Sequence, residues 1–339
     1  MFLYIPFFCI TLGALINWRG LPEKALKASD ILMNTALFVL MTVIGLNIGL
    51  SDTVMQNLGT IGAKCLAISL LAIACSVGLT VLAEKSVMPL EKIREQLARE
   101  RATEVANAQV ATAEEGIAND LGITSQGDEE GSDEKAGFSP LLIAMPAFIA
   151  VGILAGYFLV PAGENAWLDT ALTISLIFLY TGAGVMLASN KSVFVYIKRL
   201  GLRILFLPLA IFLGCLLGGL IGGLLLGVPL KWSVMSAGGM GYYSLTGAFM
   251  TEAYGIEAGV YGFIVNVSRD VFTVAFLPLL VKISKGSAIA SGAGGCMDTM
   301  LIPVSKAVGP ELSLVALISG TITTLAVPFL LPIGAALFG

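Results

Sequence analysis

The sequence predicts an all-α membrane protein, a polytopic helical bundle with about eight spans. Of its 339 residues, 57% are hydrophobic and only 12% are charged, whereas about a quarter of the residues of a soluble domain are charged. The mean hydropathy is +0.91, and the apolar residues form runs of about 18 or more, which is enough to cross a bilayer. Backbone groups in lipid must be hydrogen-bonded within the chain, so we expect these runs to be helices.

Eight apolar runs are long enough to be continuous spans. They cover residues 2–18, 31–50, 61–83, 141–160, 168–188, 204–226, 259–281 and 312–337. No basic residue precedes the first run and no clear cleavage site follows it, so we expect a retained span rather than a signal peptide. The alternating ten-residue segments of a membrane β-barrel do not occur in the sequence.

A polar insert is predicted between the third and fourth spans. Residues 85–138 begin with a charged, alanine-rich stretch and continue into a Gly/Asp/Glu/Ser stretch at 125–137, which is typical of a flexible linker. We interpret the insert as a cytosolic spacer between a first membrane bundle, residues 1–84, and a second, residues 139–339. For its helical part, a regulatory or dimer-forming role is the alternative, and a homodimer is the assembly this would produce.

Two Gly- and Ser-rich segments, residues 233–250 and 288–304, are predicted to be broken or re-entrant helices. Irregular backbone at membrane depth is tolerated where it lines a cavity, and broken helices mark the binding sites of transporters. Tight packing of two ordinary helices through small residues is the alternative interpretation.

The charge distribution and an internal likeness favour two opposed re-entrant segments. Cytoplasmic loops are enriched in Lys and Arg, and re-entry from opposite sides places Lys282 and Lys285 on the basic, cytoplasmic face, with both termini outside.

Residues 36–51 also resemble residues 174–189. Each copy belongs to a three-span unit, which predicts an inverted repeat as in many secondary transporters. Chance likeness between apolar helices is the alternative.

Asp270 and Asp298 are the main candidates for chemistry, because both fall inside predicted membrane segments. A charged residue at the centre of a span costs about 2.5–3.5 kcal/mol to insert and therefore needs a reason to be there. The chain has no histidine, so a side-chain proton would be carried most easily by a carboxylate. We expect an anionic site that binds a cation or exchanges a proton for one. A structural role, in which Arg269 neutralises these acids, is the alternative.

Further candidates lie near the two acids in sequence. Asn266 is one helical turn before Asp270 and shares its face, so it could orient the carboxylate or bind a substrate. In the first broken segment, free N–H groups at the start of a half-helix would suit a substrate carboxylate. The candidate residues in and beside this segment are Gly239, Gly241, Tyr243, Ser244 and Glu252, of which Glu252 is expected at the membrane surface.

Several other functions find no support in the sequence. The five cysteines form no CxxC pair, so neither a disulfide framework nor a metal site is expected. The Gly-rich stretches lack the P-loop pattern, which argues against ATP-driven pumping. The sequence pI near 5.0 does not indicate nucleic-acid binding. We predict no enzymatic activity and no cofactor other than a coupling ion, a proton or sodium.

Three motifs in the last third of the chain resemble the bacterial lysine exporter family of the LysO type. They are AGGMGYYSLTGAFMTEA at 237–253, NVSRD at 266–270 and GCMDTMLIP at 295–303. The resemblance implies a bacterial inner-membrane protein that exports L-lysine and analogues such as thialysine, in exchange for protons. The two membrane carboxylates that this family needs for transport correspond to Asp270 and Asp298.

The sequence departs from the family pattern at one of these acids. The family has Glu where this chain has Asp270, which is one methylene shorter. The acid is kept but its reach changes, so the departure bears on substrate choice. A sodium- or proton-coupled transporter of another small solute is the first alternative, and an ion channel is the second.

Overall fold

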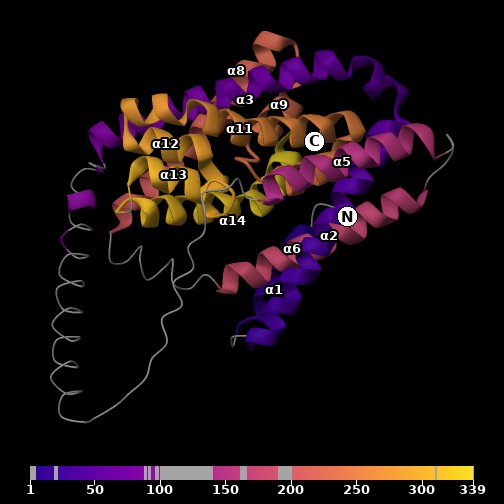
Figure 1. Cartoon of the computed structure of the whole chain (residues 1–339), viewed down its shortest axis with the longest axis horizontal. Helices are drawn as coiled ribbons and strands as arrows, with labels where there is room; N and C mark the ends of the chain where they lie inside the picture. Colours follow the sequence, from indigo (N-terminus) through magenta and orange to yellow (C-terminus); the bar gives the residue numbers. More distant parts are fainter. Residues whose placement is uncertain are drawn as a thin grey trace.

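The computed structural model describes residues 5–18, 22–87, 140–160, 166–189, 201–309 and 311–338, with residues 90, 93–95 and 99 of the insert. Every regular element in this part of the chain is a helix (Figure 1). The helices are α1 (Ile5–Ile16), α2 (Glu23–Leu50), α3 (Asp52–Ser86), α5 (Pro140–Phe158), α6 (Ala166–Ser189), η2 (Leu202–Leu205), α8 (Phe206–Leu226), α9 (Leu230–Ala237), α10 (Tyr243–Tyr254), α11 (Ile256–Ile283), α12 (Lys285–Gly292), η3 (Ala293–Met297), α13 (Leu301–Val308) and α14 (Ser313–Phe338). The predicted linker at 125–137 lies outside the described residues.

The predicted polytopic helical fold is confirmed. Six helices among the described residues, α2, α3, α6, α8, α11 and α14, are long and apolar enough to cross a membrane. The helix α1 and the apolar part of α5, Ala147–Phe158, are shorter and occupy the positions of the other two predicted spans. Length and composition therefore support six of the eight predicted spans.

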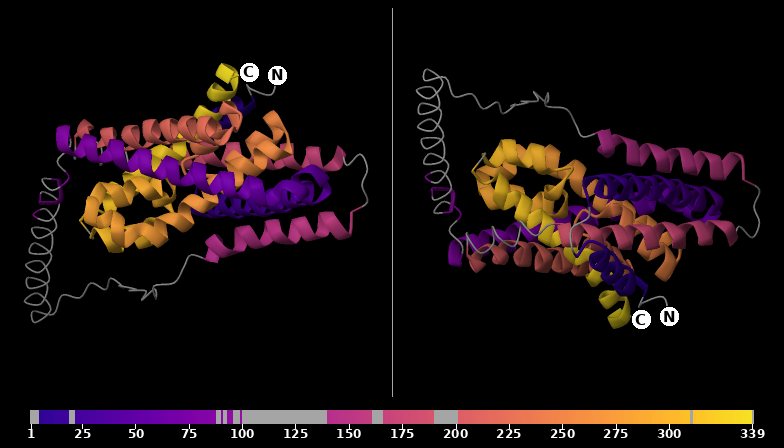
Figure 2. Two further views of the ribbon diagram at one scale, coloured as in Figure 1. Left: turned by 90° about the horizontal axis from the view of Figure 1, so that it is seen from above. Right: turned by 90° about the horizontal axis from the view of Figure 1, so that it is seen from below.

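Helices α3 and α8 lie side by side along one edge of the molecule (Figure 2). A β-carbon added at Gly214 of α8 would collide with Ser76 of α3, and one added at Gly218 would collide with Ala72. Residue numbers rise along α8 while they fall along α3, so the two helices are antiparallel. Small residues at these contacts allow the two backbones to approach closely, as is common between membrane helices.

The other helices of the two units pair in a matching pattern. Helix α1 packs on α6, and α2 packs on α5. Exchanging the unit α1–α2–α3 with the unit α5–α6–α8 leaves these pairings unchanged, and the equivalent helices α3 and α8 run in opposite directions. This arrangement supports the predicted inverted repeat. It also joins the three helices of the first predicted bundle to helices of the second in one assembly.

The first broken segment forms a re-entrant hairpin of α9 and α10. The ammonium group of Lys231, at the start of α9, lies 5.0 Å from the ring centroid of Tyr254, at the end of α10. Such a cation–π contact requires the two ends of the segment to be close together. The segment therefore enters and leaves on the same face of the molecule, and its tip, residues 238–242, lies inside.

The second broken segment, α12–η3–α13, is also a re-entrant hairpin. Lys285 at the start of α12 donates a hydrogen bond to the carbonyl of Ala307 near the end of α13, with an Nζ–O distance of 3.4 Å. The tips of the two hairpins meet, because the Gly294 N–H donates to the Met240 carbonyl at 2.8 Å. Helix α11 connects the base of the first hairpin to the base of the second, so the hairpins enter from opposite faces, as the charge distribution predicted.

Close packing of α8 on α3 should be sensitive to a single added methyl group. We expect Gly218→Ala to lower the free energy of unfolding by about 1–3 kcal/mol, because the new β-carbon would overlap the backbone of Ala72. The matched control is Gly78→Ala on α3, where no atom lies within 4 Å of the added carbon. It should be neutral or stabilise the protein by up to about 1 kcal/mol. Thermal unfolding of the purified variants in detergent measures both, and equal effects would contradict the packing described here.

Candidate functional site

The two hairpin tips bring irregular backbone into the centre of the molecule. Met240 has φ of 48° and Ala293 has φ of 44°, values that cost a residue with a side chain about 1–3 kcal/mol each. Met240 accepts the hydrogen bond that joins the tips, and Ala293 precedes its donor, Gly294. Gly241 has φ of 98°, and an added β-carbon there would lie 3.4 Å from the Gly295 nitrogen of the opposite tip. The surrounding helices must hold these strained tips in place.

Asn266 in the middle of α11 holds the first tip. Its Oδ1 accepts a hydrogen bond from the Gly241 N–H at 2.7 Å, and its Nδ2 donates to the carbonyls of Ser236 and Gly262 at 2.8 and 2.7 Å. Both donors and the acceptor of the buried amide are thus used within the protein. A β-carbon at Gly239 would lie 2.6 Å from Nδ2, so the glycine leaves room for this amide.

Arg269, almost one turn further along α11, holds the second hairpin. Its Nε donates to the Ser291 carbonyl at 2.8 Å and its Nη2 to the Ala290 carbonyl at 2.7 Å. These carbonyls belong to the last turn of α12, where a cation is favoured by the unpaired C=O groups and the helix dipole. The guanidinium also reaches Cys215 on α8 and Ser76 on α3, at 3.0 and 3.1 Å. Arg269 therefore connects three helices to α11.

Asp270 follows Arg269 and is completely buried. Its Oδ2 accepts a hydrogen bond from the Thr299 hydroxyl at 3.2 Å, while Oδ1 has no hydrogen-bond partner. A β-carbon added at Gly295 would lie 3.1 Å from Oδ1, and one at Gly241 3.7 Å away. The free oxygen therefore lies against both hairpin tips. A buried acceptor without a partner costs free energy, so we expect a proton, a cation or a water molecule to bind this oxygen.

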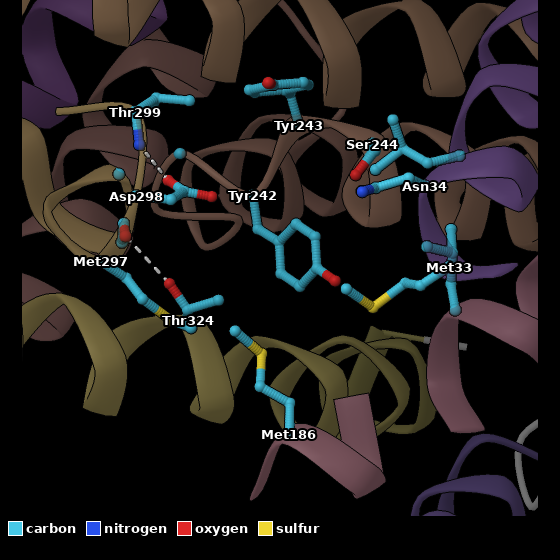
Figure 3. A pocket seen from close by; sticks show the side chains of 15 residues that line it. Met33, Asn34, Met186, Tyr242, Tyr243, Ser244, Met297, Asp298, Thr299 and Thr324 are labelled. Atoms are coloured by element: carbon cyan, nitrogen blue, oxygen red, sulfur yellow. Dashed lines mark hydrogen bonds between the residues drawn. The ribbon is translucent and has the colours of Figure 1, made fainter. Parts of the chain in front are cut away.

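Asp298 lies just beyond η3 and is accessible from a cavity of about 250 Å³ (Figure 3). Its Oδ1 accepts a short hydrogen bond from the backbone N–H of Thr299. Asp298 is the one charged residue among the described residues that line the cavity. The cavity therefore carries negative charge at one side and favours a cation.

The cavity lies between the hairpin tips and three other helices, α2, α6 and α14. In the view of Figure 3, Asp298 lies on the left of the cavity, Asn34 and Ser244 lie on the right, and the Tyr242 ring lies below and between them. Its lining is partly polar and partly apolar, with methionine and leucine side chains from α2 and α6. The residues that line it are Met33, Asn34, Leu37, Leu179, Met186, Gly241, Tyr242, Tyr243, Ser244, Gly294, Gly295, Met297, Asp298, Thr299 and Thr324. In the described ranges, no group of three or more Cys, Asp or Glu side chains is arranged to hold a metal ion.

Comparison with known proteins assigns the family. Residues 7–98 and 146–334 match the family described as "Lysine exporter LysO". The chain belongs to this family. With its long apolar helices, this LysO-family chain is a multi-pass membrane protein.

Two curated relatives resemble the LysO-family chain. "Lysine exporter LysO" of Escherichia coli K12 is 24% identical over 196 residues, which cover 57% of this chain and 65% of that protein. "Putative lysine exporter" of Haemophilus influenzae is 28% identical over 106 residues, or 31% of this chain and 54% of that protein. The chain thus spans less than two thirds of the length of each relative. No solved structure matches it significantly.

The structure gathers most of the predicted site residues of this LysO-family protein in one place. Tyr243, Ser244, Gly241 and Asp298 line the cavity, and Asp270 lies directly behind it. The others have different surroundings: Asn266, Gly239 and Arg269 support the hairpins, and Glu252 is exposed near the end of α10, outside the cavity lining.

Three polar residues of the cavity were not singled out from the sequence. Asn34 comes from α2 and Thr324 from α14, and Thr299 follows Asp298. Thr324 also donates a hydrogen bond to the Gly294 carbonyl at 3.0 Å. Asn34 and Thr324 lie in long apolar runs far from the Gly-rich motifs, and only the fold brings them to the tips. Thr299 could have been found from the sequence, because it directly follows the predicted membrane acid Asp298.

The role of Arg269 can be tested without changing its charge. Arg269→Lys should lower the thermal stability of the protein, because one ammonium group cannot reach α12, α8 and α3 at once. Each lost hydrogen bond to the charged group is worth about 1.5–3 kcal/mol. Arg203→Lys is the matched control, since Arg203 is exposed. Equal unfolding temperatures of the two variants would show that the network around Arg269 contributes little.

Proposed function

We propose that this protein exports L-lysine and related cationic amino acids such as thialysine in exchange for protons. The observation that carries the proposal is the pair of acids at the hairpin tips. Asp298 faces a cavity of about 250 Å³, and Asp270 is buried directly behind it with one oxygen unpaired. The names of the two relatives support lysine as the substrate.

The cavity suits the chemistry of lysine. The Asp298 carboxylate would bind an ammonium group, and the apolar side chains of Met33 and Met186 would contact the aliphatic stem. The start of α10 presents backbone N–H groups that suit a carboxylate. Ser244 adds a hydroxyl group at this end, because it lines the cavity and is only 2% exposed. The cavity volume of about 250 Å³ lies just below the usual range of ligand pockets, about 300–1,000 Å³, as expected for a small solute.

The two acids differ in their access to the cavity, and an exchanger of a cation for a proton needs such a difference. A cation in the cavity can reach Asp298, whereas the fully buried Asp270 is out of contact with the cavity and is connected to it through Thr299. Burial without a counter-ion favours the protonated form of a carboxylic acid. In the proposed cycle, a bound ammonium favours ionised acids and release of a proton, and a returning proton favours release of the substrate.

The position of the cavity is suited to alternating access. Its lining comes on one side from the hairpin tips and Thr324 of α14, and on the other from α2 and α6. In Figure 1, helices α1, α2 and α6 form a group beside the one that contains the second hairpin. A movement of one group against the other would open the cavity to either face, as in transporters built from inverted repeats.

The orientation in the inner membrane follows from the basic residues. Arg94 of the insert forms an ion pair with Glu311, between α13 and α14, with an N–O distance of 3.8 Å. The insert therefore meets the face at which the second hairpin enters, which also carries Lys282 and Lys285 near the base of α12. We assign this face to the cytoplasm by the positive-inside rule.

Loss of either acid should abolish exchange without unfolding the protein. We expect Asp270→Asn and Asp298→Asn to stop lysine-driven proton release from liposomes, because neither amide can carry the exchanged proton or balance an ammonium group. A pH-sensitive dye reports the proton flux, and radiolabelled lysine reports the substrate flux. The same assay with sodium gradients, or with other small solutes, separates lysine–proton exchange from the alternative couplings.

Glu252→Gln is the matched control for these substitutions. It removes an acid that lies outside the cavity, so transport should persist. Wild-type flux in both aspartate variants would exclude the proposed carboxylate mechanism. Lysine-dependent current with no counter-transport would identify a channel instead.

The assigned orientation predicts where reporter proteins function. Alkaline phosphatase fused after Phe338 should be active, because the end of α14 would face the outside. A fluorescent protein fused at the same position should not fluoresce. A fluorescent protein placed within residues 125–137 should be bright, because that segment would be cytoplasmic. The reverse pattern would overturn the assignment of the faces.

A further inference from the structure

Thr299 touches both acids of the site. Its backbone N–H donates to Oδ1 of Asp298, and its hydroxyl donates to Oδ2 of Asp270 at 3.2 Å. The residue also lines the cavity, which Asp270 does not. Thr299 is therefore the contact between the buried acid and the space in which a substrate would bind.

We propose that the Thr299 hydroxyl relays the exchanged proton between Asp270 and the cavity, an inference that rests on the proposed proton exchange. When protonated Asp270 releases its proton, the hydroxyl oxygen accepts it and gives up its own proton to Asp298 or to a water molecule in the cavity. Asp270 becomes a carboxylate, the acceptor becomes protonated, and Thr299 is left as it began. The reverse transfer reloads Asp270. One proton is thus transferred, and no other reactant is consumed.

A hydroxyl group is required for this role because it can accept and donate at once. A methyl group in the same position could do neither, and Asp270 would then lose its hydrogen bond and its connection to the cavity. Its other oxygen, Oδ1, lies against Gly241 and Gly295 and has no partner. Within the described part of the chain, the Thr299 hydroxyl is the one hydrogen-bond partner of this carboxylate, so the route to the cavity runs through Thr299.

The other titratable groups near Asp270 do not offer an equivalent path. Arg269 stays charged and is bound to the end of α12, and the Cys296 thiol is buried and directed to the Ile289 carbonyl. Tyr242 and Tyr243 also line the cavity, but the hydrogen bond that Asp270 accepts comes from Thr299. Thr299 is also bonded to Asp298, through its backbone N–H.

The relay also depends on the conformation of the second hairpin. Thr299 lies in a turn in which the N–H groups of Asp298 and Met300 both donate to the Gly295 carbonyl, at 3.0 and 2.8 Å. The hydroxyl therefore moves with this hairpin, while Asp270 moves with α11. A displacement of the hairpin would separate the two groups and close the proton route, which would link proton transfer to the state of the transporter.

Two substitutions separate the hydroxyl from the rest of the side chain. Thr299→Val keeps the branched shape and removes the hydroxyl, and Thr299→Ser keeps the hydroxyl and removes the methyl group. Each purified variant is placed in liposomes. One assay measures lysine-driven proton flux, and a second measures exchange of labelled for unlabelled lysine at equal pH on both sides, which needs binding and alternation but no net proton transfer.

The relay predicts that Thr299→Val retains lysine–lysine exchange while its lysine-driven proton flux falls by at least about tenfold, because positioned proton transfer is typically worth about 10²–10⁴-fold. Thr299→Ser should retain both activities. Thr299→Ala serves as a second hydroxyl-free variant if the valine protein does not fold, as judged by size-exclusion chromatography.

Two results would overturn the relay. One is wild-type proton flux in the valine or alanine variant. The other is an equal loss of exchange and proton flux in a folded variant, which would assign Thr299 to substrate binding or packing. Absence of lysine-driven proton flux in the wild-type protein would instead overturn the proposed exchange itself, and the relay with it.

Discussion

Hydrogen-bonding groups freed by two interrupted helices must be satisfied in the middle of this protein, and the rest of the structure depends on how this is done. Water is scarce at membrane depth, so an unpaired N–H or C=O there costs several kcal/mol. Asn266 supplies the partners for the first hairpin tip, and Arg269 supplies those for the end of α12. The two tips also bind one another through Gly294 and Met240.

The same arrangement creates the functional site. Because Asn266 and Arg269 on α11 serve the two hairpins, Asp270 is placed where the tips meet. The guanidinium is directed to carbonyls and to α3 and α8, and one carboxylate oxygen of Asp270 stays unpaired. The structure gives Arg269 a role in holding a hairpin, and its role as a neutralising partner of the acid stays an alternative interpretation. Asp298, on the tip itself, faces the cavity.

Several features of the fold could be predicted because they depend on local composition. Long apolar runs predict helices, and the Gly-rich stretches at 233–250 and 288–304 predict breaks, since glycine permits the backbone conformations found at the tips. The two lysines near the base of α12 predicted re-entry from opposite faces. Asn34 and Thr324 could not be predicted as cavity residues, because nothing in their own apolar segments distinguishes them from polar residues that support a helix.

The sequence by itself determined the membrane class, the two breaks and the two acids, because hydropathy, glycine content and a charge in an apolar run are local properties. The family resemblance carried by the last third of the chain is local in the same sense. Only the tertiary structure decided that Asp298 is accessible while Asp270 is buried, and that Thr299 joins them. Those properties arise from the crossing of two hairpins that are distant in sequence, and the spacing of residues along one chain does not specify such a crossing.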